Sequence, residues 1–411
     1  MTTERNGTPA KLDPVRPDPV RPEPIARGRR GRAILLPSGV AALACSLFAA
    51  GVASGGETNV AGSAQLDYLA VPTNSAPRST TFDGFTTELS MKLVADVNDN
   101  LVVETKVCFA CHGVEIGVAI ADVTINDHLS IRVGRFSPAF GDFPARHDPA
   151  NHRTSDKPLP YDMGRMLRLR EWNMSVLPAP YVDNGVELRG TLELGRRVEL
   201  DWAGYLVGGL RASQDATDVD FIQSRSGDWY YVDNNSMPAA GGRVVLNLLA
   251  DDSSVRLGAS AMTGSYDPAR ELDYVLLGGD VSWRSKYMTL RAEYLLRRQH
   301  MALGDHPGDD FLYGPRADGT YDTVAIKDGF YLEAEVPLGD FELVGRFDGM
   351  TRIGNVTVAS SLTDRSWILR GTLAASYRAS ANLRWKASGE LYQFSDFDSE
   401  AAFHLGLVAS F

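Results

Sequence analysis

The feature that most constrains this chain is an alternation of apolar and polar residues, repeated from about residue 65 to the C-terminus. In the last segment, residues 403–411, odd positions are mostly large and apolar, whereas His404, Gly406 and Ser410 lie on the other face. A period of two predicts β-strands with two chemically different faces. A soluble β-sandwich shows the same alternation with its apolar face turned inward, so a second feature is needed to distinguish it from a barrel.

That second feature is the length of the connections, which are alternately short and long. The seven short connections lie at 98–100, 126–128, 195–197, 251–253, 284–286, 337–340 and 378–380. The eight long connections lie at about 72–80, 108–113, 138–184, 211–238, 265–271, 299–325, 353–363 and 394–399. Fifteen connections separate sixteen strands, many of about ten residues, enough to cross a bilayer at a tilt. We therefore predict an all-β fold, a 16-stranded antiparallel transmembrane β-barrel with both ends on the short-turn side.

Composition excludes two other classes of protein. Mean hydropathy is −0.16, which argues against a bundle of membrane helices but suits alternating strands. The formal charge is −11, which makes general binding to nucleic acid unfavourable.

The N-terminus has the order of residues typical of an export signal. A segment rich in Pro and Arg precedes an apolar run at 40–53, which ends in small residues. This order predicts a secretory signal cleaved near Ala53, with a single membrane anchor as the alternative. We divide the chain into an extension and signal peptide (1–53), a short periplasmic segment (54–64) and a barrel (65–411). Export combined with a barrel predicts the outer membrane of a Gram-negative bacterium.

Two short segments carry a resemblance to known porins. The final strand closes on Phe411 and resembles the C-terminal assembly signal of outer-membrane porins, and IRVGRFSPAFG at 131–141 resembles the strand-to-loop motif of the phosphate-selective porin group. The resemblance implies a sixteen-stranded, trimeric porin whose third long loop narrows the channel. The chain lacks a ladder of Lys and Arg suited to phosphate and is acidic, so phosphate selectivity is not carried over.

The sharpest chemical motif is Cys108-Phe109-Ala110-Cys111-His112. CxxCH is the attachment motif of c-type haem: both thiols form thioether bonds to the porphyrin and the adjacent imidazole binds the iron. The sequence therefore predicts one covalent haem c with His112 as the proximal ligand. The alternatives are a CxxC disulfide beside an incidental histidine and a zinc site with a remote fourth ligand.

Strand parity places this motif toward the lumen. In 101–108, Glu104, Lys106 and Cys108 are predicted to face inward. In the next strand Ile116, Val118 and Ile120 are predicted to face lipid. The small residues Gly117, Ala119 and Ala121 are predicted to face inward, leaving volume for a porphyrin, although they would equally suit a crowded wall.

The long loop 138–184 offers further candidates. His147 or His152 is a candidate distal haem ligand, with Met163 or Met166 as a weaker one; without any of them the iron would be five-coordinate. The loop is also basic, which predicts an anion filter, a brace for haem propionates or a salt-bridged constriction. Its basic residues are Arg146, Arg153, Lys157, Arg165, Arg168 and Arg170.

These features predict a porin-like channel carrying one haem, for electron transfer, for solute diffusion or for both. The alternatives are a passive porin whose CxxC is a disulfide, and a haem enzyme or sensor for peroxide or small gaseous ligands. The predicted partners are outer-membrane lipid, small solutes, redox-partner cytochromes and two further copies in a homotrimer. We assign no catalytic residue.

Overall fold

The structure is a computed structural model that describes residues 56–72, 84–110, 113–163, 165–172, 175–211, 232–301, 315–316, 318–356 and 360–411. Contacts divide the chain into residues 1–49 and residues 50–411, and the fold described below belongs to the second unit. The predicted signal peptide lies outside the described residues. None of the helices in the described ranges is long and apolar enough to cross a membrane.

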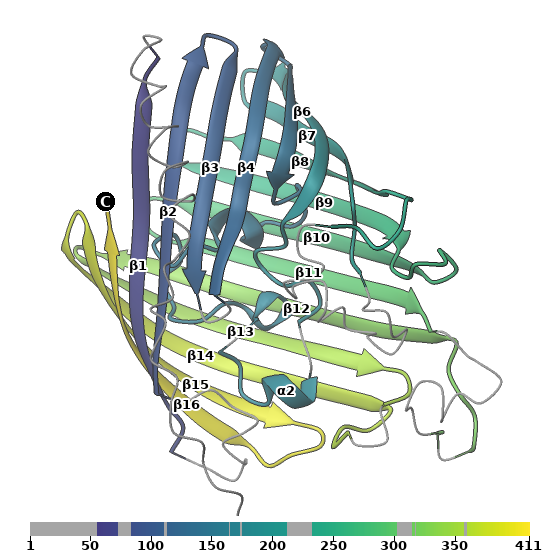
Figure 1. Ribbon diagram of the computed structural model, residues 1–411. Coiled ribbons are helices and arrows are strands. Elements are labelled where there is room, and N and C mark those ends of the chain that lie inside the picture. Colours follow the sequence, from purple (N-terminus) through teal and green to yellow (C-terminus); the bar gives the residue numbers. More distant parts are fainter. Residues whose placement is uncertain are drawn as a thin grey trace, which may run out of the picture. The chain divides into compact units, whose positions relative to one another are not determined.

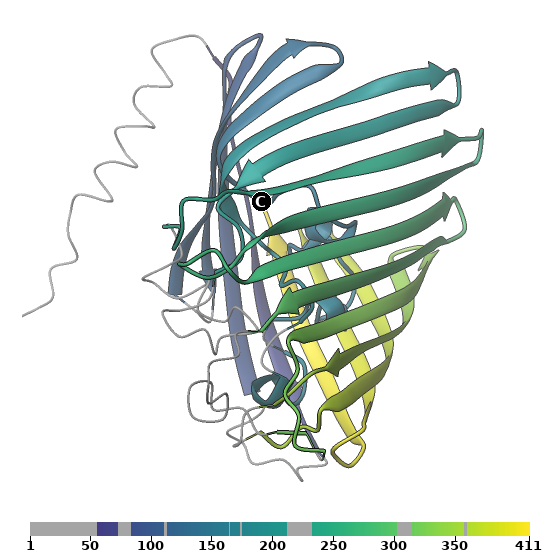
Figure 2. The same cartoon turned by 90° about the vertical axis from the view of Figure 1, so that its right-hand side faces the viewer.

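The described residues form sixteen β-strands that close into one barrel, which confirms the predicted fold. The strands are β1 (Thr58–Ala70), β2 (Gly84–Asn98), β3 (Leu101–Ala110), β4 (Gly113–Asn126), β5 (Leu129–Phe136), β6 (Asp183–Gly195), β7 (Val198–Val207), β8 (Ala239–Leu249), β9 (Ser253–Ser265), β10 (Asp273–Ser285), β11 (Thr289–His300), β12 (Val324–Leu338), β13 (Phe341–Ile353), β14 (Arg365–Ser380), β15 (Leu383–Phe394) and β16 (Glu400–Ser410). Each strand pairs antiparallel with its neighbours in sequence, and the strands follow one another around the wall (Figures 1 and 2).

The barrel closes where the first strand meets the last. β1 pairs with β16 from Ser63↔Ser410 to Ala70↔Phe403. The backbone of Phe411 adds two hydrogen bonds with Gly62, of 2.9 and 3.1 Å. Closure leaves no sheet edge with unpaired backbone groups, which is the condition for β-structure to exist in lipid. β1 begins at Thr58, so the predicted periplasmic segment 54–64 is partly strand, and the predicted start at Gln65 was too late.

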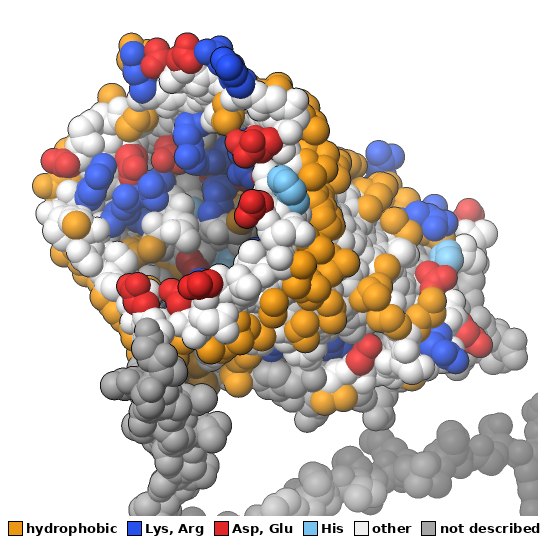
Figure 3. All heavy atoms as spheres, turned by 90° about the horizontal axis from the view of Figure 1, so that it is seen from above, with side chains coloured by type: hydrophobic (Ala, Val, Ile, Leu, Met, Phe, Trp, Pro, Cys, Tyr) orange, Lys and Arg blue, Asp and Glu red, His pale blue; other side chains and the backbone are white. Residues whose placement is uncertain are grey.

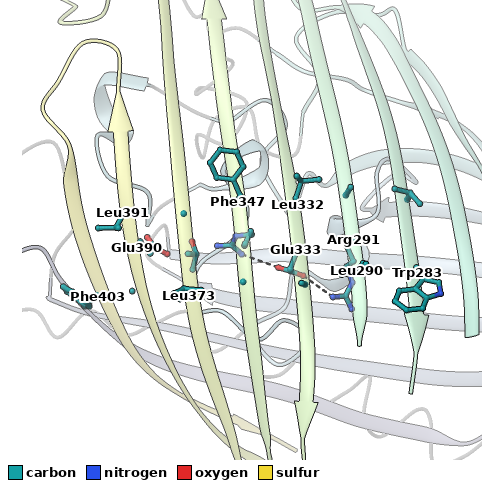
Figure 4. A pocket seen from close by; sticks show the side chains of 18 residues that line it. Trp283, Leu290, Arg291, Leu332, Glu333, Phe347, Leu373, Glu390, Leu391 and Phe403 are labelled. Atoms are coloured by element: carbon teal, nitrogen blue, oxygen red, sulfur yellow. Dashed lines mark hydrogen bonds and ion pairs between the residues drawn. The ribbon is translucent and has the colours of Figure 1, made fainter. Parts of the chain in front are cut away.

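The two faces of each strand differ as the alternation predicts, and the apolar face points outward. Leu332 is 52% exposed while its neighbour Glu333 is 7% exposed, and Leu391 is 69% exposed while Glu390 is 1% exposed. Figure 4 shows these pairs, with Glu333 in an ion pair to Arg291 at 3.1 Å. On the outer surface of β10–β16, apolar side chains border a hollow of about 1050 Å³. A soluble sandwich would bury these side chains, so this arrangement excludes it.

The third long connection, residues 137–182, folds into the barrel and is called loop 3 below. It contains η1 (Phe143–Arg146), η2 (Leu159–Tyr161) and the one-turn helix α2 (Leu169–Trp172). Its apolar side chains pack against inward-facing residues of the wall in the buried core: Phe143, Leu159 and Tyr161 are fully buried, and the rings of Phe143 and Tyr161 stack 5.4 Å apart. The core of this protein therefore lies inside the barrel, between loop 3 and the wall.

Candidate functional site: the lumen and loop 3

Loop 3 is tied to the wall by charged side chains from strands far along the chain. Arg346 on β13 donates to Oδ1 of Asp156 at 2.7 Å, and Arg370 on β14 contacts the same carboxylate. Arg370 also donates to the carbonyl of Lys157 at 2.7 Å and to Oδ1 of Asp348 at 2.9 Å. All four charged side chains are fully buried, and each charge is paired, which is the condition under which burial of a charge is tolerated.

The basic residues of loop 3 take part in the same kind of contact. Arg146 reaches Glu333 at 3.3 Å, Arg153 reaches Glu342 at 2.8 Å and Arg168 donates to Glu400 at 2.9 Å. Arg165 lies within 4.0 Å of Asp67 and Glu88, and Lys157 donates to the carbonyl of Ala179 at 2.7 Å. These five of the residues predicted as an anion filter are thus engaged in contacts that fix the loop, as expected for a salt-bridged constriction.

The residues predicted as distal haem ligands are partly or fully buried, and His147 is also hydrogen-bonded. Nδ1 of His147 donates to the carbonyl of Pro144 at 2.6 Å, and Nζ of Lys106 donates to its Nε2 at 3.4 Å. Burial lowers the pKa of His147 to about 4, although the adjacent Asp148 alone would raise it. His152 is 4% exposed, its ring centroid lies 5.9 Å from that of Phe143, and burial lowers its pKa well below the usual range. Met166 is 1% exposed within the core, and Met163 is half-buried.

The wall around Cys108 follows the predicted parity on one strand but not on the next. Lys106 on β3 contacts His147 and Asp148 of loop 3, so Cys108, two residues on, faces the lumen as predicted. Gly117 is buried beside it: a Cβ on this glycine would lie 3.3 Å from the Cys108 sulfur. Cys111 and His112 lie outside the described residues, so the structure does not test the haem motif.

A β-bulge makes part of the parity prediction for β4 wrong. The register shifts between Lys106 and Val107, so that Gly117 is an extra residue with no partner on β3. Beyond the bulge Ile120 is buried in the core while Ala119 is exposed on the outer face. The facing of four residues is consequently reversed: Val118 and Ile120 point inward, and Ala119 and Ala121 point outward. The predicted volume for a porphyrin therefore loses two of its three small residues.

A hollow in the lumen lies on the side of the barrel opposite the contacts of Arg346 and Arg370 with loop 3. This hollow of about 560 Å³ separates β5–β9 from the first residues of loop 3. Four arginines from different strands line it, Arg132, Arg189, Arg243 and Arg256, called the arginine wall below. Viewed from the short-turn end, the mouth is hollowed, with Lys and Arg side chains gathered inside and hydrophobic side chains outside (Figure 3).

Each arginine of this wall is held by wall or loop groups. Arg243 donates two hydrogen bonds to Asp280, at 2.6 and 2.9 Å, and a third to Ser260 at 3.0 Å. Arg132 lies 3.2 Å from Glu187, and Arg189 contacts Asp122.

Arg256 donates to Asn247 at 3.1 Å and lies 3.5 Å from Asp142 of loop 3. These four arginines are not among the site residues predicted from the sequence. The alternation in the sequence does place arginines on the inward face of neighbouring strands. Which of these arginines border open space depends on the path of loop 3, which the alternation does not give.

Comparisons with solved structures agree with the fold. The chain is similar to OmpF of Salmonella typhi, solved in complex with daunomycin, at TM-score 0.54 and 12% identity over 87% of this chain and 99% of that one. It is also similar to the outer membrane channel DcaP of Acinetobacter baumannii, at TM-score 0.50 and 14% identity over 87% of this chain and 98% of that one. OmpT of Vibrio cholerae gives TM-score 0.50 and 10% identity over 87% and 98%. At these identities the likeness defines the fold, a porin-like barrel.

No family model matches the sequence, and no curated protein matches it.

Proposed function

We propose that this protein is a passive diffusion channel in the outer membrane of a Gram-negative bacterium. The observation that carries the proposal is a closed sixteen-stranded barrel with an apolar outer face, a charged interior and a long loop folded into its lumen. Backbone groups paired around a closed cylinder can exist in lipid, and large polar-lined barrels are the class that leaves an aqueous channel.

The tethers of loop 3 favour a fixed constriction rather than a lid. Arg346 and Arg370 hold Asp156 from two strands, and Glu293 on β11 accepts the N–H of Asp142 at 2.9 Å. Breaking several buried ion pairs together would expose unpaired charge, so opening by release of the loop is costly. Solutes are therefore expected to pass through the remaining hollow beside β5–β9.

Planar-bilayer recording tests the channel. The purified, folded protein should give ohmic conductance steps. Ala145→Trp, at an exposed position lining the hollow, should reduce the step size. Ala119→Trp adds the same ring to the outer face and should leave the step size unchanged. A folded wild-type protein that gives no steps, or equal steps in all three proteins, would contradict this route.

A covalent haem at Cys108, Cys111 and His112 is a second candidate, supported by the CxxCH motif and by the inward position of Cys108. A bound haem c would supply one-electron chemistry. The described surroundings offer little to it, because both ring nitrogens of His147 are hydrogen-bonded and His152 is buried among other side chains. The homotrimer and the redox-partner cytochromes likewise stay predictions.

A pyridine-haemochrome spectrum of protein exported by cells that mature c-type cytochromes decides between haem and disulfide. Haem attachment predicts the spectrum of a thioether-linked haem in the wild type, and a loss or change of that spectrum in Cys108→Ser. A colourless protein whose thiols react with maleimide only after reduction would instead support the passive channel with a Cys108–Cys111 disulfide.

A further inference from the structure

The two sides of the 560 Å³ hollow differ in chemistry. One side is the arginine wall of β5, β6, β8 and β9. The other is the start of loop 3, where Pro138, Ala139, Pro144 and Ala145 border the same space. A solute in this hollow would therefore meet guanidinium groups on one side and an apolar edge on the other.

The arginines are more exposed to a solute than their counter-charges are. The side chains of Arg189 and Arg256 are 41% and 46% exposed, whereas those of Asp122 and Asp142 are 12% and 13% exposed. Glu187 and Asp280, which pair with Arg132 and Arg243, are 2% and 3% exposed. The paired carboxylates are thus less accessible than the guanidinium groups, and Asp127, Glu187 and Asp201 also border the hollow.

Guanidinium groups held in place are the donors best suited to planar carboxylates. Arg243 is fixed by three hydrogen bonds, and Arg256 is fixed by Asn247 and Asp142. Fixed forked donors recognise carboxylate groups with little loss of side-chain freedom. The apolar edge opposite them favours a solute whose remaining surface is apolar, because that surface loses contact with water in the hollow.

We infer that this hollow favours small organic anions with an apolar body, such as aryl or short alkyl carboxylates. The inference rests on the proposed diffusion channel and names the solute class for the same lumen. The charged end of the solute would lie against Arg189 and Arg256 and its apolar body against Ala139 and Ala145.

Selectivity measurements in planar bilayers and liposomes test the inference with benzoate, acetate and benzylammonium as probes. Wild-type protein should pass benzoate faster than benzylammonium, and the double variant R189Q/R256Q should lower that ratio by at least about threefold. R189K/R256K keeps the charge and should keep most of the preference. Arg197→Gln, in the exposed turn between β6 and β7 and outside the hollow, should have no effect.

The apolar side has its own test. Ala145→Asn should lower the ratio of benzoate to acetate permeation while leaving the preference of acetate over small cations in place.

Conducting wild-type protein with no preference for benzoate, or an unchanged preference in R189Q/R256Q, overturns the inference and leaves the channel standing. A folded wild-type protein that conducts nothing overturns the channel itself and the inference with it. Migration of the folded and heat-denatured forms on SDS gels verifies that each variant is folded.

Discussion

The phenolic oxygen of Tyr161 lies 2.5 Å from Oε1 of Glu293, a hydrogen bond that joins η2 of loop 3 to β11 of the wall. The same carboxylate accepts the backbone N–H groups of Asp142 and Phe143, at 2.9 and 3.4 Å. One wall side chain therefore fixes two turns of the loop that are separate in sequence. It holds the loop close to the residues that border the open hollow.

Tyr161→Phe should destabilise the folded barrel by about 1–3 kcal/mol, because it leaves a buried carboxylate with one hydrogen bond fewer. Glu293→Gln should cost a similar amount and add current noise to open channels, since an amide cannot replace all three accepted hydrogen bonds. Tyr294→Phe is the matched control: its hydroxyl donates to Asp328 at 2.7 Å on an exposed site. Unfolding curves in detergent should separate the two tyrosines, and equal losses would contradict the role given to Glu293.

Arg370 is the residue whose loss should disturb loop 3 most. Its guanidinium contacts Asp156, the carbonyl of Lys157 and Asp348, and both carboxylates are fully buried. Arg370→Met leaves Arg346 to satisfy two buried carboxylates, which should cost about 3–5 kcal/mol.

Arg370→Lys should recover only part of this loss, because an ammonium cannot form the forked contacts. The free energy of unfolding in urea measures both variants. Arg197→Ala removes an exposed ion pair at 2.7 Å and should change little. An Arg370→Met protein as stable as Arg197→Ala would show that the buried network does not hold the loop.

The barrel could be predicted from sequence because its determinants are local. The alternation sets the faces of each strand, and turn residues such as those at 98–100 and 195–197 end the strands where the structure ends them. The bulge is the exception. A glycine within a strand, such as Gly117, is typical of a bulge, but the pattern at 116–121 is equally compatible with a regular strand. One inserted residue reverses the facing of every later side chain in the strand.

The contacts of loop 3 could not be predicted, because they join residues far apart in sequence. Asp156 and Arg370 are 214 positions apart, and no local pattern near either one names the other. The sequence showed that the loop is basic. It did not show that wall carboxylates engage those charges, nor that the open space lies beside the arginines of other strands.

The outer face makes a prediction about depth in the membrane. Leu373, in the middle of β14, is 76% exposed, and Leu338, at the turn end of β12, is 53% exposed. Leu373→Arg should destabilise the barrel in lipid vesicles by about 2–4 kcal/mol, and Leu338→Arg by about 1 kcal/mol or less. Equal effects at the two positions would argue that this face does not lie in a bilayer.

The proposed channel should also lose stability in acid through His147. Burial holds the pKa of its imidazole at about 4, against 6.5 for the ordinary value. Between these two values the unfolded chain binds a proton that the folded chain does not, so the free energy of unfolding rises with pH across this window. Acidification from about pH 7 to pH 4 should therefore remove about 3 kcal/mol through this group.

His147→Gln keeps a polar side chain without a titrating group and should flatten the pH dependence across that window. His128→Gln, in an exposed turn, is the control and should leave the wild-type slope unchanged. Urea unfolding of the three proteins from pH 4 to pH 7.5 supplies the slopes. If the free energies of unfolding of wild type and His147→Gln fall in parallel as the pH is lowered, His147 takes up its proton in the folded barrel as readily as in the unfolded chain. Its contacts with Pro144 and Lys106 would then not be those that hold the loop.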